Sequence, residues 1–314
     1  MSTLATLLMQ NEPGAVVPER HALCESEWPC ERELTDVFRA LCEKYSVAIP
    51  QHWRLTGGSC SCGSDEILLV PAGGAYRCDV VPLLYWRQER RFMELQKLVS
   101  TRTIEDVVMC RFSCTGSRSG ESLSQIMFRE YDLLEWITNS AITDLYATMY
   151  DGVFANVVAT ITSGAVCSIE VGSTLPRGHK SENLDRHELI ARRGVASDRV
   201  VDTQIPQQSI YLYKESSRET WTDCDAELFG LPMNAIYLIR AAFELAKRVN
   251  NDRSLEKMEI AKLRNRARRL DQLVTVTCTA ARNGERAANL DRKEDCELFA
   301  NTNPCKGQQE RSNV

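Results

Sequence analysis

Residues 151–176 read DGVFANVVATITSGAVCSIEVGSTLP, and this stretch decides the fold. Two runs of alternating apolar residues flank the short turn Thr162-Ser163-Gly164. Successive side chains of a strand point to opposite faces, so each run offers one apolar face, and the glycine-containing turn predicts a hairpin. An isolated hairpin is only marginally stable, so further strands and a covering helix are expected. The apolar positions are Val153, Ala155, Val157, Ala159 and Ile161 in the first run and Ala165, Cys167, Ile169 and Val171 in the second.

The sequence on both sides of this hairpin supplies the remaining elements. Runs of strand-forming residues occur before and after it, and apolar residues recur at helical spacing in several longer segments. We therefore predict an α+β fold with a large, mostly antiparallel sheet and helices on one face. The candidate strands are 106–112, 188–191 and 209–213, and the candidate helices are 34–42, 90–99, 126–137, 232–249 and 270–281.

The predicted sheet domain covers residues 80–285. Residues 51–79 contain five glycines and the run Cys60-Ser-Cys62. We interpret them as an inserted loop segment with one strand at 67–70. Residues 286–314 are polar and poor in aromatic side chains, which predicts a disordered tail.

Composition narrows the class of protein. The chain of 314 residues has a formal net charge of -5 and a pI near 5.6, which argues against general binding to nucleic acid or anionic membranes. No apolar run approaches the ~20 residues that span a bilayer. The first residues, MSTLATLLMQNEPG, lack the basic region of a secretory signal. We therefore expect a cytoplasmic protein whose 13 cysteines are reduced thiols.

Two further motifs favour ordinary interpretations. Cys60, Cys62 and Cys78 lie near His52, but a single Cys-x-Cys without a second pair is a weak zinc signal, so no metal site is predicted. Residues 262–269 (KLRNRARR) are basic, yet no aromatic residues interleave them and their charges spread around a helix. A solvated helix face is favoured over a nucleic-acid site.

The order of motifs resembles that of the Gfo/Idh/MocA oxidoreductase family over roughly residues 18–285. Residues 21–26 (HALCES), the helix after them and the apolar residues 47–49 resemble the family's strand ending in Glu-Lys-Pro, with its helix and next strand. Residues 85–112 resemble its domain-crossing segment. The resembling segments farther along are 129–136 (REYDLLEW, its active-site helix), 164–170 (GAVCSIE, its sheet) and 279–284 (TAARNG, its last helix).

The departures from the family pattern concern the catalytic apparatus. No Gly-x-Gly-x-x-Gly turn is present, and only about twenty residues precede His21, so the resemblance implies that residues 1–50 hold a partial Rossmann-like remnant. Ser26 aligns with the family's lysine, and Gln125 and Arg129 align with its active-site Asp and His. These replacements remove a proton donor and a titratable base.

The resemblance identifies six pocket positions. The loop after the first strand, the domain-crossing segment and the active-site helix converge on the substrate in the family, so they would flank any ligand here. Each residue also has a structural alternative as a helix cap, a surface charge or a member of an ion pair. The positions are Glu25, Ser26, Arg87, Gln125, Arg129 and Asp132.

Three hypotheses about function follow. The family acts on sugars, inositols and polyols with NAD(P), and the first hypothesis is a catalytically impaired member that serves as a ligand-binding or partner subunit. It needs no cofactor, forms a homo-oligomer through the sheet face, and binds a sugar acid through Arg129, or a polyol. The second is an active NAD(P)-dependent oxidoreductase whose N-terminal half is on another chain or lost from the gene model. The third is a structural oligomerisation module.

Overall fold

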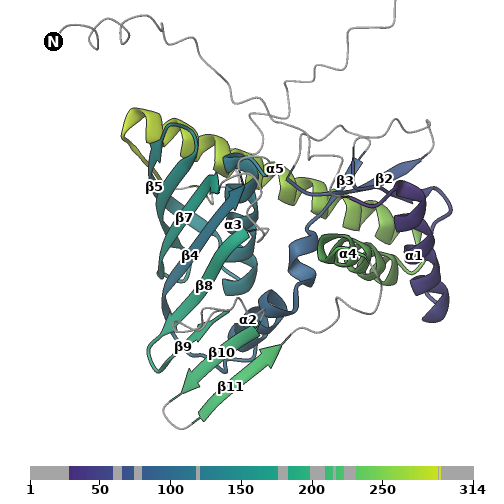
Figure 1. Ribbon diagram of the computed structural model, residues 1–314, viewed down its shortest axis with the longest axis horizontal. Coiled ribbons are helices and arrows are strands. Elements are labelled where there is room, and N and C mark those ends of the chain that lie inside the picture. The colour runs from purple at the N-terminus through teal and green to yellow at the C-terminus, as the bar shows by residue number, and fades with distance from the viewer. Residues whose placement is uncertain are drawn as a thin grey trace, which may run out of the picture.

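Figure 1 shows the computed structural model of the protein. The structure describes residues 28–58, 66–73, 80–117, 121–175, 183–198, 209–214, 217–222, 231–288 and 290. Residues 1–27, and with them Glu25 and Ser26, lie outside the described residues, as do Cys60, Cys62 and Cys78.

A nine-stranded sheet dominates the molecule, in the order β11-β10-β9-β8-β4-β7-β6-β5-β12. All its neighbouring strands are antiparallel except β4 and β7, which are parallel. The prediction of an α+β fold with a large, mostly antiparallel sheet is confirmed. The strands are β4 (Val107–Ser117), β5 (Ile142–Tyr150), β6 (Phe154–Ile161), β7 (Val166–Leu175), β8 (Asn183–Ala191), β9 (Gly194–Ser197), β10 (Ser209–Lys214), β11 (Ser217–Thr222) and β12 (Arg286–Ala287).

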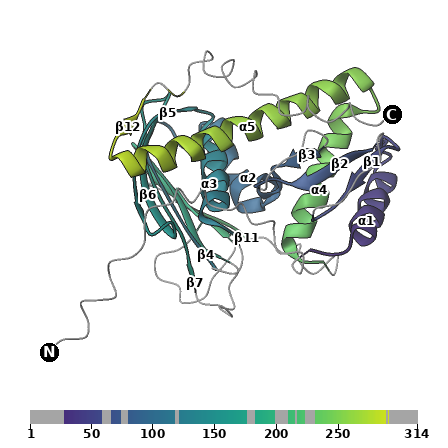
Figure 2. The ribbon, with the colours of Figure 1, turned by 90° about the horizontal axis from the view of Figure 1, so that it is seen from above.

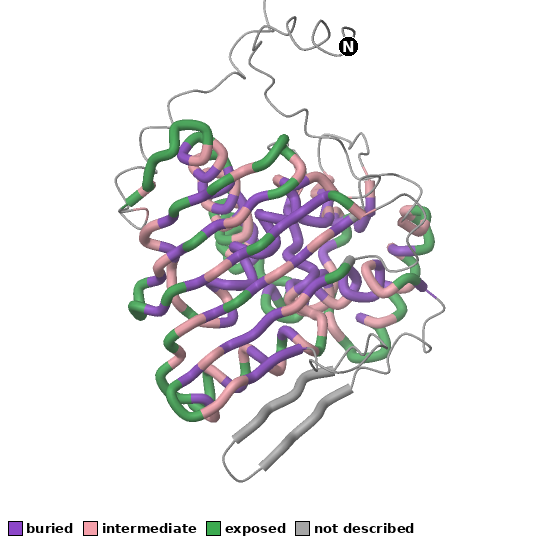
Figure 3. The backbone as a smooth tube through the Cα atoms, turned by 60° about the vertical axis from the view of Figure 1, so that its left-hand side comes forward, coloured by how far each residue is buried: buried purple, intermediate pink, exposed green. Residues whose placement is uncertain are grey.

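The predicted hairpin is formed by β6 and β7, with Val157 opposite Ile169 and Ala159 opposite Cys167. These four side chains are buried, and the residues between them lie on the other face. Figure 3 shows this alternation of buried and exposed residues along the strands. The alternating apolar pattern therefore sets both the pairing and the face of the sheet that meets the helices.

Three helices lie over the inner face of this sheet: α2 (Arg90–Ser100), α3 (Leu123–Thr138) and α5 (Arg253–Asn283) (Figures 1 and 2). Ser122 and Gln125 form a capping box at the start of α3. Nearly all of α3 is buried, charged residues included, because α2, α5 and the sheet surround it. Gly284 ends α5 with a φ of +66°, a left-handed conformation that suits glycine.

A second sheet of three parallel strands lies beside the first, in the order β1-β2-β3 (Figure 2). Its strands are β1 (Trp53–Leu55), β2 (Ile67–Pro71) and β3 (Val80–Leu83), and α1 (Glu31–Lys44) and α4 (Met233–Val249) pack around it. The described residues between these strands contain no helix, whereas a Rossmann domain joins parallel strands through helices. The parallel sheet alone therefore does not define the expected Rossmann remnant.

The predicted domain boundaries need correction. Residues 51–79 are not an inserted loop segment, because β1 and β2 are two of the three strands of the parallel sheet. Residues 80–285 contribute β3 and α4 to that smaller layer as well as the large sheet. The expected tail begins with β12, which pairs with β5. Residues 291–314 lie outside the described part of the chain.

The last helix is longer than predicted and spans 31 residues. Its residues 262–269 are not simply a solvated face, because three of their arginines point inward. Arg264 donates to the Val80 carbonyl, Arg269 donates to the Ile142 carbonyl, and Arg266 binds buried carboxylates. No helix in the described ranges is both long and apolar enough to cross a membrane.

Candidate functional site

The structure brings four of the six predicted pocket residues to one region. Gln125, Arg129 and Asp132 lie on α3, and Arg87 lies on the short 3-10 helix η2 (Tyr85–Gln88). Only Arg87 keeps appreciable exposure, with 24 % of its side chain accessible. Gln125, Arg129 and Asp132 are buried. This burial means that the partners of each side chain decide what it can bind.

Asp132 is held by arginines from two directions. Arg87 Nε donates to Asp132 Oδ2 at 2.8 Å, and Arg266 Nε donates to Asp132 Oδ1 at 2.8 Å. Trp86 Nε1 also donates to Oδ2 at 2.8 Å. Burial alone would raise the pKa of Asp132, but Arg87 and Arg266 lower it below its ordinary value. Asp132 is therefore an anion at neutral pH that joins η2, α3 and α5.

Glu135 lies one turn farther along α3 and extends this cluster. Arg266 Nη1 contacts its Oε2, and Arg269 Nη2 donates to its Oε1 at 2.8 Å. Its Oε1 also accepts the backbone N–H of Ile142 at 2.7 Å. Burial would raise the pKa of Glu135, yet Arg266 and Arg269 lower it. The arginines of α5 thus fix that helix to α3 and to the start of β5.

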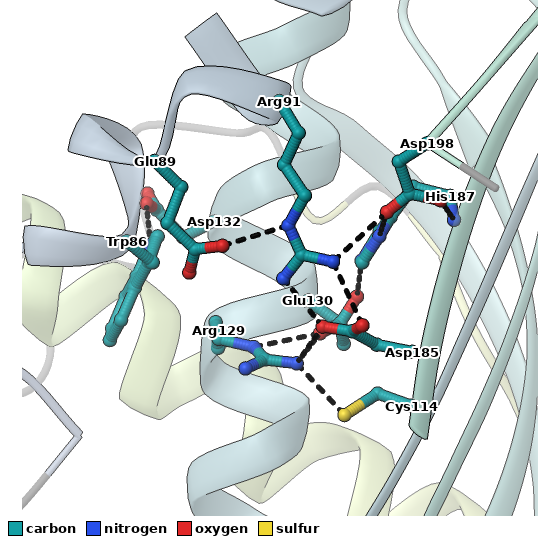
Figure 4. A network of polar contacts seen from close by, with 10 residues as sticks. All are labelled: Trp86, Glu89, Arg91, Cys114, Arg129, Glu130, Asp132, Asp185, His187 and Asp198. Carbon is teal, nitrogen blue, oxygen red and sulfur yellow. Dashed lines mark hydrogen bonds and ion pairs between the residues drawn. The ribbon is translucent and has the colours of Figure 1, made fainter. Parts of the chain in front are cut away.

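Arg129 lies toward the sheet in a second cluster (Figure 4). Its Nε donates to Glu130 Oε1 at 2.9 Å, its Nη2 lies 2.8 Å from Cys114 Sγ, and the same nitrogen lies 3.5 Å from Asp185 Oδ2. Burial would lower the pKa of Arg129, but Cys114 and Glu130 hold it well above the ordinary value. The side chain is 8 % exposed, so the guanidinium already has its anionic partners inside the protein.

His187 on β8 is the buried residue that links this cluster to the sheet. Its Nε2 lies 2.8 Å from Glu130 Oε2 and its Nδ1 lies 2.6 Å from Asp198 Oδ2. The rings of Phe92 and Phe112 pack edge-on against the imidazole. Burial would lower the pKa of His187, but Asp198 and Glu130 raise it to about 10. The ring is therefore a cation at neutral pH and has no free nitrogen for proton transfer.

Arg91 on α2 completes the network. Its Nη1 and Nη2 donate to the two oxygens of Asp185 at 2.8 and 2.7 Å, and Nη1 also lies 3.3 Å from Asp198 Oδ2. Its Nε donates to Glu89 Oε2 at 2.8 Å. Figure 4 shows Arg91 between these carboxylates. One arginine thus joins α2 to β8 and to the residue that follows β9.

Three residues of the network, His187, Arg91 and Asp198, were not among the predicted pocket positions. In the sequence, His187 is a lone histidine beside a polar loop, a pattern that does not by itself indicate a functional site. However, residues 185, 187, 189 and 191 alternate with outward-facing residues on β8. That period of two places Asp185 and His187 on the inner face. The alternating pattern of residues 184–191 (LDRHELIA) was therefore the sequence signal that could have placed these two residues inside the protein.

Gln125 differs from its neighbours because half of its amide is unsatisfied. Its Oε1 accepts the backbone N–H of Ser122 at 2.7 Å. Its Nε2 is buried and makes no hydrogen bond among the described residues. Because Oε1 is fixed at the start of α3, Nε2 lies at the same end of the helix. A Cβ added at Gly73, two residues after β2, would lie 3.9 Å from Gln125 Cγ, so the chain after β2 runs close to this side chain. A buried donor without a partner is costly, so this end of α3 suits a ligand with an acceptor oxygen.

Helix α1, which packs beside the parallel sheet, does not fit a dinucleotide. A pyrophosphate binds a helix N-terminus that follows a glycine-rich turn and is free of negative charge. Here α1 carries Glu31 and Glu33 in its first turn. These carboxylates would repel a pyrophosphate. The described residues also contain no group of His, Cys, Asp and Glu side chains that could hold a metal.

The chain is similar in structure to proteins of the Gfo/Idh/MocA type. One is levoglucosan dehydrogenase in complex with NADH and L-sorbose, with TM-score 0.52, 11% identity, and 71% of this chain and 73% of that chain covered. Another is an inositol dehydrogenase homolog from Azotobacter vinelandii complexed with NADH and myo-inositol, with TM-score 0.51, 10% identity and coverage of 71% and 72%.

A third similar structure is a super-repressor mutant of Gal80p from Saccharomyces cerevisiae, with TM-score 0.53, 10% identity and 73% of each chain covered. No protein-family profile and no curated protein sequence matches the chain. At such identities the likeness establishes the fold. The resemblance read from the order of motifs is thereby confirmed as a Gfo/Idh/MocA-type fold.

Proposed function

We propose that the protein binds a small neutral polyol at the N-terminus of α3 and does not transfer hydride. The observation that carries this proposal is the difference in hydrogen bonding between Gln125 and Arg129. Gln125 and Arg129 stand where the resemblance expects the catalytic Asp and His. Gln125 Nε2 is buried without a partner in the described part of the chain, whereas the Arg129 guanidinium is already paired.

The chemistry of these side chains supports a binding role. An amide does not ionise, and a guanidinium stays protonated at any physiological pH, so neither can accept a proton from a hydroxyl. His187 is the histidine of the described network, and both of its ring nitrogens are occupied by carboxylates. Among the described residues, the site thus offers one unpaired donor, Gln125 Nε2, for a ligand oxygen, while its histidine is already paired.

Charge favours a polyol over a sugar acid. An anion at Arg129 would have to replace Glu130 or Asp185, and both carboxylates are buried beside it. Glu121 adds a further negative charge that acts on Arg129. A neutral hydroxyl or ring oxygen can accept from Gln125 Nε2 without meeting this repulsion.

Isothermal titration of myo-inositol, several sugars and the matching sugar acids against the purified chain tests the proposal. We expect binding of at least one neutral polyol, weaker binding of the acids, and loss of binding in Gln125→Leu. Gln51→Leu is the matched control, because Gln51 is exposed in the turn before β1. Equal binding by wild type and Gln125→Leu, or tighter binding of the acids, would contradict the assignment.

The alternative is an NAD(P)-dependent oxidoreductase whose nucleotide-binding half comes from another chain. Two similar structures are complexes with NADH, which favours this alternative. The acidic first turn of α1 opposes it for this chain alone. Titration with NAD(H) and NADP(H) separates the two, since binding at micromolar affinity or turnover of any polyol would reject the non-catalytic proposal.

We also propose that two copies associate through the outer face of the large sheet. This face carries exposed apolar side chains beside Arg111 and Glu170, so both charges needed for a self-complementary contact are present. The exposed apolar residues are Tyr146, Phe154, Val158 and Val166. If this association were the chain's whole role, no polyol would bind, which is the outcome expected for a structural oligomerisation module.

A further inference from the structure

The cluster around Arg91 contains more carboxylates than cations. Its anions are Glu89, Glu130, Asp185 and Asp198, and its cations are Arg91, Arg129 and His187. Among the side chains joined by these contacts, four negative charges face three positive charges, and Glu121 adds a further negative charge that acts on Arg129. A buried cluster with an excess of negative charge is costly, and protonation of one carboxylate lowers that cost.

The contacts identify the carboxylate that holds the proton. Asp185 receives both ends of the Arg91 guanidinium, and Asp198 receives the ring and the backbone N–H of His187. Glu130 bridges Arg129 and His187. Glu89 has a single charged contact among the described residues, with Arg91. It is the least satisfied member of the cluster.

We propose that Glu89 carries an exchangeable proton, and that its ionisation loosens the clamp by which Arg91 joins α2 to β8. The side chain of Glu89 is 13 % exposed, so the proton has a route to solvent, whereas that of Asp198 has none. As N-cap of α2, Glu89 makes no side-chain hydrogen bond to the first turn that would favour the ionised form.

Every element packed around Glu89 contributes to this balance. Burial raises the pKa of Glu89, Arg91 opposes that change, and Asp185 adds to it. When Glu89 ionises, it competes with Asp185 and Asp198 for the same guanidinium, so the contact between α2 and β8 weakens. The charged groups that act on Glu89 are Arg91 on α2, Arg129 on α3 and Asp185 on β8. Through Arg91, Arg129 and Asp185 the network continues to Glu130 on α3, His187 on β8 and Asp198 after β9.

The sign of the pH dependence follows from a raised pKa. A carboxyl that binds its proton more tightly in the folded state stabilises the fold below its unfolded pKa of 4.5, and this stabilisation is lost as pH rises. Glu89→Gln keeps an acceptor for Arg91 Nε but cannot ionise. We therefore expect the urea midpoint of Glu89→Gln to rise relative to wild type from pH 4.5 to neutral pH.

Glu94→Gln is the matched control, since Glu94 lies on the same helix and pairs only loosely with Lys97, at 3.7 Å. Its midpoint relative to wild type should not rise with pH. A second measurement, hydrogen exchange of the β8 amides corrected for intrinsic rates, tests the clamp itself. Protection of β8 should fall with pH in wild type and stay constant in Glu89→Gln.

Three results would overturn the proposal. The first is a midpoint difference between Glu89→Gln and wild type that does not grow with pH, because Glu89 would then not titrate in this range. The second is lower stability of Glu89→Gln at neutral pH, which would show an ionised, stabilising carboxylate. The third is an identical pH dependence of β8 amide exchange in both proteins. It would show that ionisation of Glu89 does not weaken the contact that Arg91 makes between α2 and β8.

Discussion

Asp198 holds His187 at two points. Its Oδ1 accepts the backbone N–H of His187 at 2.7 Å, and its Oδ2 lies 2.6 Å from Nδ1. Glu130 binds the opposite ring nitrogen, so the imidazolium cannot turn and cannot lose its proton to solvent easily. A cation is thereby built into the inner face of the sheet, where α2 and α3 meet it.

We expect His187→Phe to lower the free energy of unfolding by about 3–5 kcal/mol, the range for breaking a buried ion pair. The new ring fits the aromatic neighbours Phe92 and Phe112, but it leaves Glu130 and Asp198 without their cation. Urea unfolding followed by circular dichroism measures the loss. His52→Phe is the control, because His52 is 36 % exposed and should cost less. A loss below about 1 kcal/mol for His187→Phe would show that the carboxylates find other partners.

The raised pKa of His187 predicts a loss of stability in alkali. The group contributes stability that is complete below its ordinary pKa of 6.5 and is lost as pH rises through about 10. Unfolding midpoints measured between these pH values should fall for the wild type. The fall should be smaller in the double variant Glu130→Gln with Asp198→Asn, which removes the two anions that raise the pKa. An equal fall in both proteins would assign the alkaline loss to another group.

Asp132→Asn should destabilise the fold at neutral pH by about 3–5 kcal/mol, because Arg87 and Arg266 lose a buried anion. The pKa of Asp132 is lowered, so its contribution is complete above 3.8 and is lost as pH falls through the folded value. The gap between wild type and variant should therefore narrow in acid. Asp36→Asn provides the comparison, since Asp36 is exposed and forms only a 3.7 Å pair with Arg32.

Val158→Asp should convert the associated form to monomer, because Val158 is exposed at the centre of the outer sheet face between β5 and β7. Size-exclusion chromatography with light scattering measures the mass directly. Met93→Asp places the same charge on an exposed site of α2, on the other side of the sheet, and should leave the mass unchanged. A monomeric wild type at working concentration would reject the interface.

The hairpin and the helices could be predicted because their signals are local. The period of two in 151–176 depends on neighbours within the same strand, and Ala155, Val157, Cys167 and Ile169 are all buried as expected. In the same way, the apolar spacing around Leu34 and Phe38 predicted α1. Local patterns report which face of an element is buried.

The site could not be predicted in full because its contacts are distant in sequence. Asp132 lies 134 residues from Arg266, and Glu130 lies 57 residues from His187. Read alone, the charges on α3 resemble those of a surface helix, although almost all of them are buried. The first half of α5 was missed because its buried apolar stripe, formed by Ile260, Leu263 and Ala267, is thin and lies among many charged residues.

Helix α5 also limits how the protein can move. A helix of 31 residues is about 46 Å long at 1.5 Å per residue. It donates to β3 of the parallel sheet through Arg264 and to the start of β5 through Arg269. One continuous rod is therefore attached to both sheets, and a hinge between them would have to bend it or break those contacts. We expect the two layers to move as one rigid body, so that a ligand between them enters by local opening of loops and not by domain closure.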